Sequence, residues 1–174
     1  ALKRGVKERY ALSIMNSVLG GMATSRFFQK IREEMGLAYY IRSGADAFEE
    51  TGSWGVAAGV KKEDAEEAVK AILKEMDDFV GKNKPTSVEV ERAKTNMIGN
   101  IKLKMESSSE EVGRVVNGLV LENRVRPYEE IFSGIEAVTV DDVVAVAGRI
   151  FKNGLNLSVV GPFEDKERFE KLLK

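Results

Sequence analysis

The chain has 174 residues, of which 43% are hydrophobic and 32% are charged, and its formal net charge is -1. This length and composition are typical of one soluble domain with its own core, and the balanced charge argues against a nucleic-acid or membrane surface. Histidine and cysteine are both absent. Their absence excludes a Ser-His-Asp triad, a Cys-His dyad, a disulfide framework and a zinc site built from the nitrogen and sulfur ligands that zinc prefers.

Targeting signals are not evident in the sequence. No stretch approaches the roughly 20 apolar residues that a membrane-spanning helix needs. The first residues, ALKRGVKERYAL, also lack the apolar centre of a signal peptide. We therefore expect a cytoplasmic protein with no membrane partner and no nucleic-acid partner.

Two helices are predicted at the start of the chain. Apolar side chains recur at three- and four-residue spacing over about residues 7–19, which predicts an amphipathic helix that ends at Gly20-Gly21. Thr24 or Ser25 can cap a second, shorter helix, which Gly36 closes. The apolar face of this second helix is formed by Phe27, Phe28, Ile31 and Met35.

A β-hairpin is predicted next, because the hydrophobic period changes to two. One face of its first strand would carry Leu37, Tyr39, Ile41, Ser43 and Ala45. A turn over residues 49–52 leads into a second strand over residues 54–60, which would pair antiparallel with the first. Gly55, Ala57 and Gly59 leave one face of that strand nearly bare, which often marks a place where another backbone or a ligand approaches closely.

The rest of the chain is mostly helical. Apolar spacing and helix-start signals predict helices over about residues 63–80, 87–105, 108–122, 128–137 and 140–151. The start signals are Thr86 with Glu89, Ser107 with Glu110 or Ser108 with Glu111, Pro127, and Thr139 with Asp142. Residues 155–161, LNLSVVG, are predicted to form a strand, and a closing helix follows around Phe169. The sequence thus predicts one α+β domain in which six or seven helices pack on one face of an antiparallel-rich sheet of at least three strands.

These blocks resemble the C-terminal half-domain of the pitrilysin/insulinase family of zinc metallopeptidases, which includes the mitochondrial processing peptidases. Residues 18–43, VLGGMATSRFFQKIREEMGLAYYIRS, resemble the family pattern of Leu-Gly-Gly, Ser-Arg-Leu-Phe, Ile-Arg-Glu and Gly-Leu-Ala-Tyr. The blocks ETGSWGVAAGV, VEVERAKTNMIGNIKLKMES, IEAVTVDDVVAVAGRIF and LSVVGP follow in the family's order. The resemblance covers residues 8–162, and its opening block is the most specific, because it fixes several residue types across two structural transitions.

The resemblance implies a fold and a division of labour. Residues 1–174 would form a single C-terminal half-domain of a clamshell peptidase, without the first strand that such half-domains usually have and without the zinc-binding N-terminal half. That partner half would hold zinc through an H-x-x-E-H motif, whereas this chain would carry no catalytic residue, no metal and no cofactor. The positions that match the family's substrate-binding pair are Arg32 and Tyr39, which would contact a peptide substrate near the scissile bond.

Other interpretations stand beside this one. Taken singly, Arg32 is typical of a solvated cation near a helix end, and Tyr39 is typical of a strand residue whose ring packs in the core. For the whole protein, the alternative to a substrate-binding, non-catalytic half is a structural or assembly subunit with the same fold and no proteolytic role. A missing first strand would leave an open sheet edge, which also permits a homodimer. On either interpretation, the chain alone is expected to be inactive.

Overall fold

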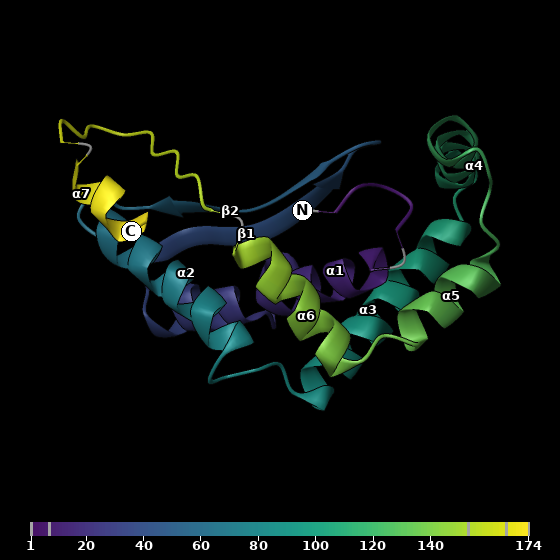
Figure 1. The fold of residues 1–174 in the computed structure, drawn as a ribbon, viewed down its shortest axis with the longest axis horizontal. Helices are drawn as coiled ribbons and strands as arrows, with labels where there is room; N and C mark the ends of the chain where they lie inside the picture. Colours follow the sequence, from purple (N-terminus) through teal and green to yellow (C-terminus); the bar gives the residue numbers. More distant parts are fainter. Residues whose placement is uncertain (1, 7, 153, 166, 174) are drawn as a thin grey trace.

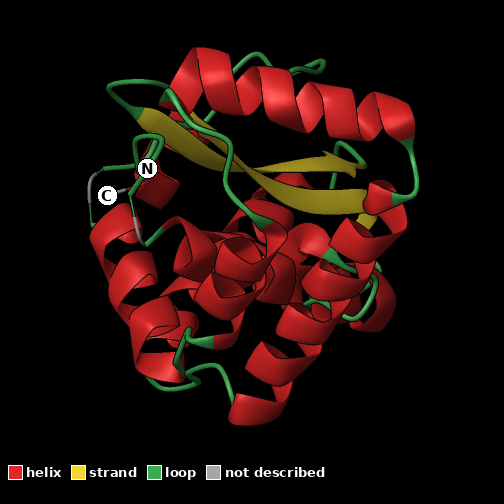
Figure 2. Ribbon diagram, turned by 90° about the vertical axis from the view of Figure 1, so that its right-hand side faces the viewer, coloured by secondary structure: helices red, strands yellow, loops and turns green. Residues whose placement is uncertain are grey.

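The computed structural model of the protein describes residues 2–6, 8–152, 154–165 and 167–173, and it shows a β-hairpin lying on a layer of helices (Figure 1). The two strands are β1 (Ala38–Ala47) and β2 (Gly52–Val60), which pair antiparallel. Most helices lie on one side of the hairpin, whereas α4 (Ser108–Glu122) lies apart from them, near the turn that joins β1 and β2 (Figure 2). The mixed architecture confirms the predicted α+β class.

The predicted helices are present with bounds close to the expected ones. Besides α4 they are α1 (Arg9–Asn16), α2 (Ala65–Val80), α3 (Ser87–Met105), α5 (Tyr128–Glu136), α6 (Val140–Phe151), α7 (Glu167–Glu170) and the short η3 (Lys171–Leu173). Thr86 with Glu89 and Thr139 with Asp142 form the two predicted capping boxes. Between the two alternatives for α4, Ser107 is the cap, because its side chain accepts a hydrogen bond from the Glu110 backbone.

The first two helices differ from the expected regular form. The predicted helix over residues 7–19 is α-helical in α1 and then widens into a π-helical turn, η1 (Ser17–Gly21). The second helix, η2 (Phe27–Glu34), is π-helical throughout. π-helical segments are rare and frequently occur at functional sites, since they shift the side chains that follow them around the helix axis. Both lie in the block that carries the family resemblance.

Gly20 allows η1 to pack directly against β1. A Cβ atom at Gly20 would lie 2.6 Å from the backbone nitrogen of Ser43, where no normal contact is possible. We therefore expect Gly20→Ala to lower the free energy of unfolding by about 1–3 kcal/mol, the usual effect of overpacking a core. The matched control is Gly99→Ala in α3, where a Cβ would meet nothing within 4 Å and the higher helix propensity of alanine should stabilise the fold slightly. Denaturant unfolding measures both changes, and an unchanged stability in Gly20→Ala would contradict the close contact.

The sheet contains two strands in the part of the chain that the structure describes, so the prediction of at least three strands is wrong. Residues 155–161, which were expected to form a strand, have no regular secondary structure and pair with no strand among the described residues. A strand needs a partner edge at hydrogen-bonding distance, which a local pattern does not specify.

The core lies between the hairpin and the helical layer. Its fully buried apolar side chains include Ile14, Met15, Leu19, Phe27, Ile31, Phe79 and Val143. Ile41 and Ser43 of β1 face this core and are buried. The opposite face is open, because a Cβ at either member of the Gly44–Gly55 cross-strand pair would meet nothing within 4 Å. The hairpin thus turns one face to the helices and the other to solvent.

Candidate functional site

The turn from η2 into β1 places the two predicted site residues. The backbone N–H of Leu37 donates to the carbonyl of Ile31 at 3.0 Å, which ties the end of the helix to the start of the strand. Gly36 has φ +66°, the left-handed conformation that glycine adopts without strain. Arg32 comes one residue after Ile31, and Tyr39 comes two residues after Leu37. This backbone hydrogen bond therefore holds Arg32 and Tyr39 on either side of one tight turn.

Arg32 is held by its neighbours on η2 while its head stays accessible. Its guanidinium carbon lies 4.5 Å from the centroid of the Phe28 ring, and its Nε lies 3.6 Å from a carboxylate oxygen of Glu33. The side chain is 39% exposed. An exposed cation–π contact and a loose ion pair are each worth at most about 1 kcal/mol, so they orient the guanidinium without occupying all its donors.

Tyr39 points into solvent, with 86% of the residue exposed. The alternative that its ring packs in the core is therefore wrong, and so is the prediction that it shares a face with Ile41 and Ser43, which are buried. The cause is a shift in the strand register. Ala38 and Tyr40 of β1 lie opposite Val60 and Gly59, which are adjacent in β2, so Tyr39 has no partner in β2. Tyr39 is the extra residue of this β-bulge, and a bulge redirects a side chain in this way.

The two side chains share a turn but not a contact. Within the described residues, no hydrogen bond or cation–π contact joins Arg32 to Tyr39. The face of β2 that carries Gly55, Ala57 and Gly59 was predicted to be approached closely by another group. At Gly59 that group is the ring of Tyr40, which lies where a Cβ would be. Arg32 and Tyr39 are therefore both solvent-accessible near the same turn.

An ionic cluster around the buried Glu75, at the start of η2, was not predicted from the sequence. Glu75 of α2 is only 1% exposed, and it accepts hydrogen bonds from Lys30 Nζ at 2.6 Å and from Arg26 Nη1 at 3.3 Å. Arg26 also donates to both carboxylate oxygens of Glu89 on α3, at 2.6 and 2.8 Å. We call these four residues the Arg26 cluster. A signal for it was present, because Glu75 lies four residues before Phe79 on the apolar face of α2.

The Arg26 cluster joins the start of η2 to two helices and to the loop between them. Two guanidinium nitrogens of Arg26 donate to the carbonyl oxygens of Asn83, at 2.5 Å, and Lys84, at 3.1 Å. Burial alone would lower the pKa of Arg26, but the hydrogen bonds and charges of Glu89 and Glu75 raise it. Burial also acts to raise the pKa of Glu89, yet hydrogen bonds from Arg26 and Thr86 lower it from 4.5 to about 2. The cluster thus holds its charges fixed and anchors the helix that carries Arg32.

The lowered pKa of Glu89 makes stability depend on pH. The unfolded chain binds the proton at about pH 4.5 and the folded chain only near pH 2, so the stabilisation is complete above about 4.5 and is lost as the pH falls toward 2. The expected loss is at most about 3 kcal/mol, since one pKa unit corresponds to about 1.4 kcal/mol. Denaturant unfolding between about pH 6 and pH 3 should show a shallower pH dependence in Glu89→Gln than in wild type. The exposed control Glu106→Gln should keep the wild-type slope, and equal slopes in all three proteins would contradict the assignment.

The described residues offer neither a metal site nor a membrane span. No group of three or more acidic side chains is arranged there to hold a metal ion. None of the helices in these ranges combines the length and the apolar character that crossing a membrane requires.

Comparisons with known proteins agree with the family resemblance found in the sequence. The family model for the "Peptidase M16 inactive domain" matches residues 3–97, more than half of the chain. The chain is 32% identical to an uncharacterized zinc protease of Streptomyces coelicolor over 95% of its own length and 36% of that protein's length. It is 28% identical to an uncharacterized zinc protease of Bacillus subtilis, covering 92% of the chain and 39% of the relative. The chain thus spans little more than a third of the length of these curated relatives.

Solved structures agree on the fold. A conserved protein from Enterococcus faecalis superposes with a TM-score of 0.76 at 25% identity, covering 85% of this chain and 34% of that one. The peptidase M16 inactive domain from Pseudomonas fluorescens superposes with a TM-score of 0.74 at 24% identity, covering 85% and 35%. The two-layer arrangement around the hairpin is therefore a known one.

Proposed function

The chain belongs to the peptidase M16 inactive-domain family, and from this premise we propose that it is the substrate-binding, non-catalytic half of a zinc metalloendopeptidase. A zinc-binding half, in the same polypeptide or in another subunit, would supply the metal and the attacking water. This chain would close the chamber around the peptide and contact it near the scissile bond. Its lack of histidine and cysteine fits such a division, since zinc ligands would come from the other half.

One observation carries the proposal: the turn between η2 and β1 turns both Arg32 and Tyr39 outward, although it lies directly over the core. Attack of a zinc-bound water on a peptide carbonyl places negative charge on the carbonyl oxygen. A phenol O–H and a guanidinium are donors that stabilise such charge, and the planar guanidinium also fixes the direction of a peptide carbonyl. Arg32 and Tyr39 are the residues that offer these donors at this turn.

The competing proposal is a structural or assembly subunit with the same fold. A chain of Complex III2 from Candida albicans superposes with a TM-score of 0.71 at 18% identity over 84% of this chain and 37% of that one. At that identity the likeness concerns the fold alone, so it supports the alternative only by showing that the fold occurs in a large assembly.

The test combines the chain with its zinc-binding half and measures peptide hydrolysis for wild type, Arg32→Ala and Tyr39→Phe. The peptidase proposal expects activity only in the combination, no stoichiometric zinc in the chain alone, and a loss of turnover in both variants. Folded variants that turn over as fast as wild type would favour the assembly subunit. Stoichiometric zinc in the purified chain would contradict the division of labour itself.

A further inference from the structure

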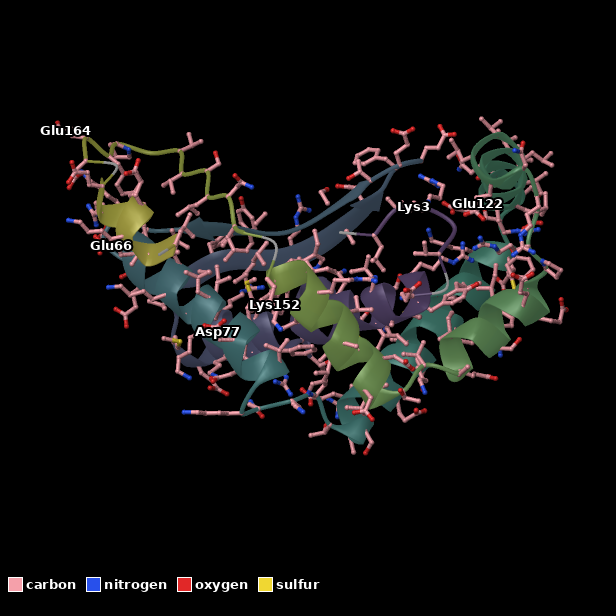
Figure 3. The ribbon with its side chains drawn as sticks, viewed as in Figure 1. Lys3, Glu66, Asp77, Glu122, Lys152 and Glu164 are labelled. Carbon is pink, nitrogen blue, oxygen red and sulfur yellow. The ribbon has the colours of Figure 1, made fainter. Side chains whose placement is uncertain are left out.

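Arg42 lies on the open face of the hairpin, a few residues beyond the turn between η2 and β1. Ile41 and Ser43 of β1 are buried against the helices. Tyr40, Arg42 and Gly44 alternate with them and are exposed. Successive side chains of a strand point to opposite faces, so Arg42 leaves the sheet on the side away from the helical core. Figure 3 shows fewer side chains along the middle of that side than along the helices.

The surroundings of Arg42 leave its guanidinium uncovered. Its partner across the hairpin is Ala57, which has only a methyl group. The ring of Tyr40, on one side of it, lies over Gly59. On its other side the cross-strand pair consists of two glycines, and a Cβ added to either would meet nothing within 4 Å. Among the described residues, no hydrogen bond, ion pair or ring contact involves Arg42.

The chemistry of Arg42 suits a carboxylate on a bound molecule. A guanidinium is always charged, and its planar fork of N–H donors matches the two oxygens of a carboxylate. The open face also carries Asp46, but its carboxylate accepts a hydrogen bond from Ser53 at 3.4 Å instead of pairing with Arg42. The bare glycines beside Arg42 leave room for the main chain of another polypeptide to come close. An acidic side chain of a peptide therefore fits this position.

The spacing between Arg42 and Tyr39 sets where on a peptide this side chain would be. Arg42 comes three residues after Tyr39 in β1. A strand rises about 3.3 Å per residue, so the two positions are about 10 Å apart, and an extended peptide covers that distance in about three residues. On the proposed function, Tyr39 contacts the peptide near the scissile bond. An acidic side chain that reaches Arg42 is then about three residues from that bond.

We propose that Arg42 is a specificity-determining residue, which selects peptides that carry an acidic side chain about three residues from the scissile bond. This inference rests on the proposed function, because it needs a peptide held at Arg32 and Tyr39. The guanidinium of Arg42 donates to the carboxylate of that side chain. Since Arg42 lies on an open surface, the preference for an acidic over a neutral side chain is that of an exposed ion pair, about fivefold at most, and salt weakens it.

The test measures kcat/KM for peptide hydrolysis by the chain combined with its zinc-binding half. The probe is an uncharged, internally quenched peptide, GAQAFLAQAG, and mass spectrometry of its products identifies the bond that is cut. Glutamate, glutamine or lysine is then placed three residues before or three residues after that bond. At one of these two positions glutamate should raise kcat/KM by about threefold to fivefold over glutamine, and lysine should lower it. In about 1 M NaCl both effects should largely disappear, since the Debye length falls to about 3 Å.

Variants locate the effect at one side chain. Arg42→Glu should reverse the preference, so that the lysine peptide is cut faster than the glutamate peptide, and Arg42→Gln should abolish it. The matched control Arg92→Glu changes the net charge by the same amount at an exposed position on α3, and it should keep the wild-type preference.

Two results would overturn the inference. One is equal kcat/KM for the three peptides at both positions in a wild-type combination that cuts them all. The other is the same change of preference in Arg42→Glu and in Arg92→Glu, because the selection would then follow net charge and not Arg42. Both leave the proposed function standing, which the turnover of Tyr39→Phe tests separately. A combination that cuts no peptide would overturn the proposed function and this inference with it.

Discussion

Replacing Tyr39 with phenylalanine is expected to lower kcat for peptide hydrolysis by about 100-fold when the chain is combined with its zinc-binding half. The substitution removes one hydroxyl from a ring that is 86% exposed, so no packing is lost. On the proposed function, the hydroxyl would donate to charge that develops in the transition state, and a donor of that kind acts on turnover more than on substrate binding. Arg32→Ala should lower kcat/KM by a similar factor, with part of the loss in KM, because on the same proposal the guanidinium would also hold the peptide in place.

Controls must separate contact with substrate from general effects of substitution. Arg92→Ala removes an exposed arginine from α3, and Tyr10→Phe removes a phenol hydroxyl that accepts a hydrogen bond from Arg9. Both should turn over at close to the wild-type rate. The Tm of the Tyr39 and Arg32 variants should stay within a few degrees of wild type, since surface substitutions change stability by about 0.5 kcal/mol or less. A loss of kcat below about threefold for Tyr39→Phe, in a folded protein, would remove the phenol from the mechanism.

Arg26→Met is expected to lower the free energy of unfolding by about 3–5 kcal/mol, the usual effect of removing one partner from a buried ion pair. The guanidinium is 10% exposed and bonds to Glu89, Glu75 and two backbone carbonyls. Without it, Glu89 loses its cation, Glu75 keeps only Lys30, and the carbonyls lose their donors. Denaturant unfolding provides the measurement.

A second variant keeps this prediction testable if Arg26→Met fails to fold. Arg26→Lys keeps the charge but loses the planar fork that reaches Glu89 with two hydrogen bonds, so it should be destabilised by a smaller amount. The matched control is Arg92→Met, at an exposed position on α3, which should change stability by about 0.5 kcal/mol or less. Equal stability of the Arg26 and Arg92 variants would show that the Arg26 cluster does not hold the fold together.

Helix starts could be predicted from the sequence because they depend on local chemistry. Two capping boxes start α3 and α6, formed by Thr86 with Glu89 and by Thr139 with Asp142. In each box the two side chains accept hydrogen bonds from each other's backbone N–H groups, and the box spans only four consecutive residues. The choice between Ser107 and Ser108 as the cap of α4 was left open by the sequence. Two adjacent serines offer the same chemistry, and the structure decided between them.

The site was predicted only in part, for a physical reason. Tyr39 and Arg32 could be selected because their positions match the family pattern, but the direction of Tyr39 depends on the bulge opposite Val60 and Gly59, a property of strand pairing. The same holds for residues 155–161, which were expected to form a strand but pair with no other strand among the described residues. The π-helical form of η2, which packs against β1, was likewise not predicted from the sequence.

The sequence by itself indicated most helix starts, the hairpin, the absence of histidine and cysteine and, through the family resemblance, the candidate pair Arg32 and Tyr39. The helix starts and the hairpin depend on a residue and its neighbours within one or two turns. Only the tertiary structure decided that Tyr39 faces solvent, that Glu75 is buried between Arg26 and Lys30, and that the sheet of the described residues has two strands. Each of these joins segments far apart in the chain, because burial and strand pairing are set by packing between elements rather than by local propensity.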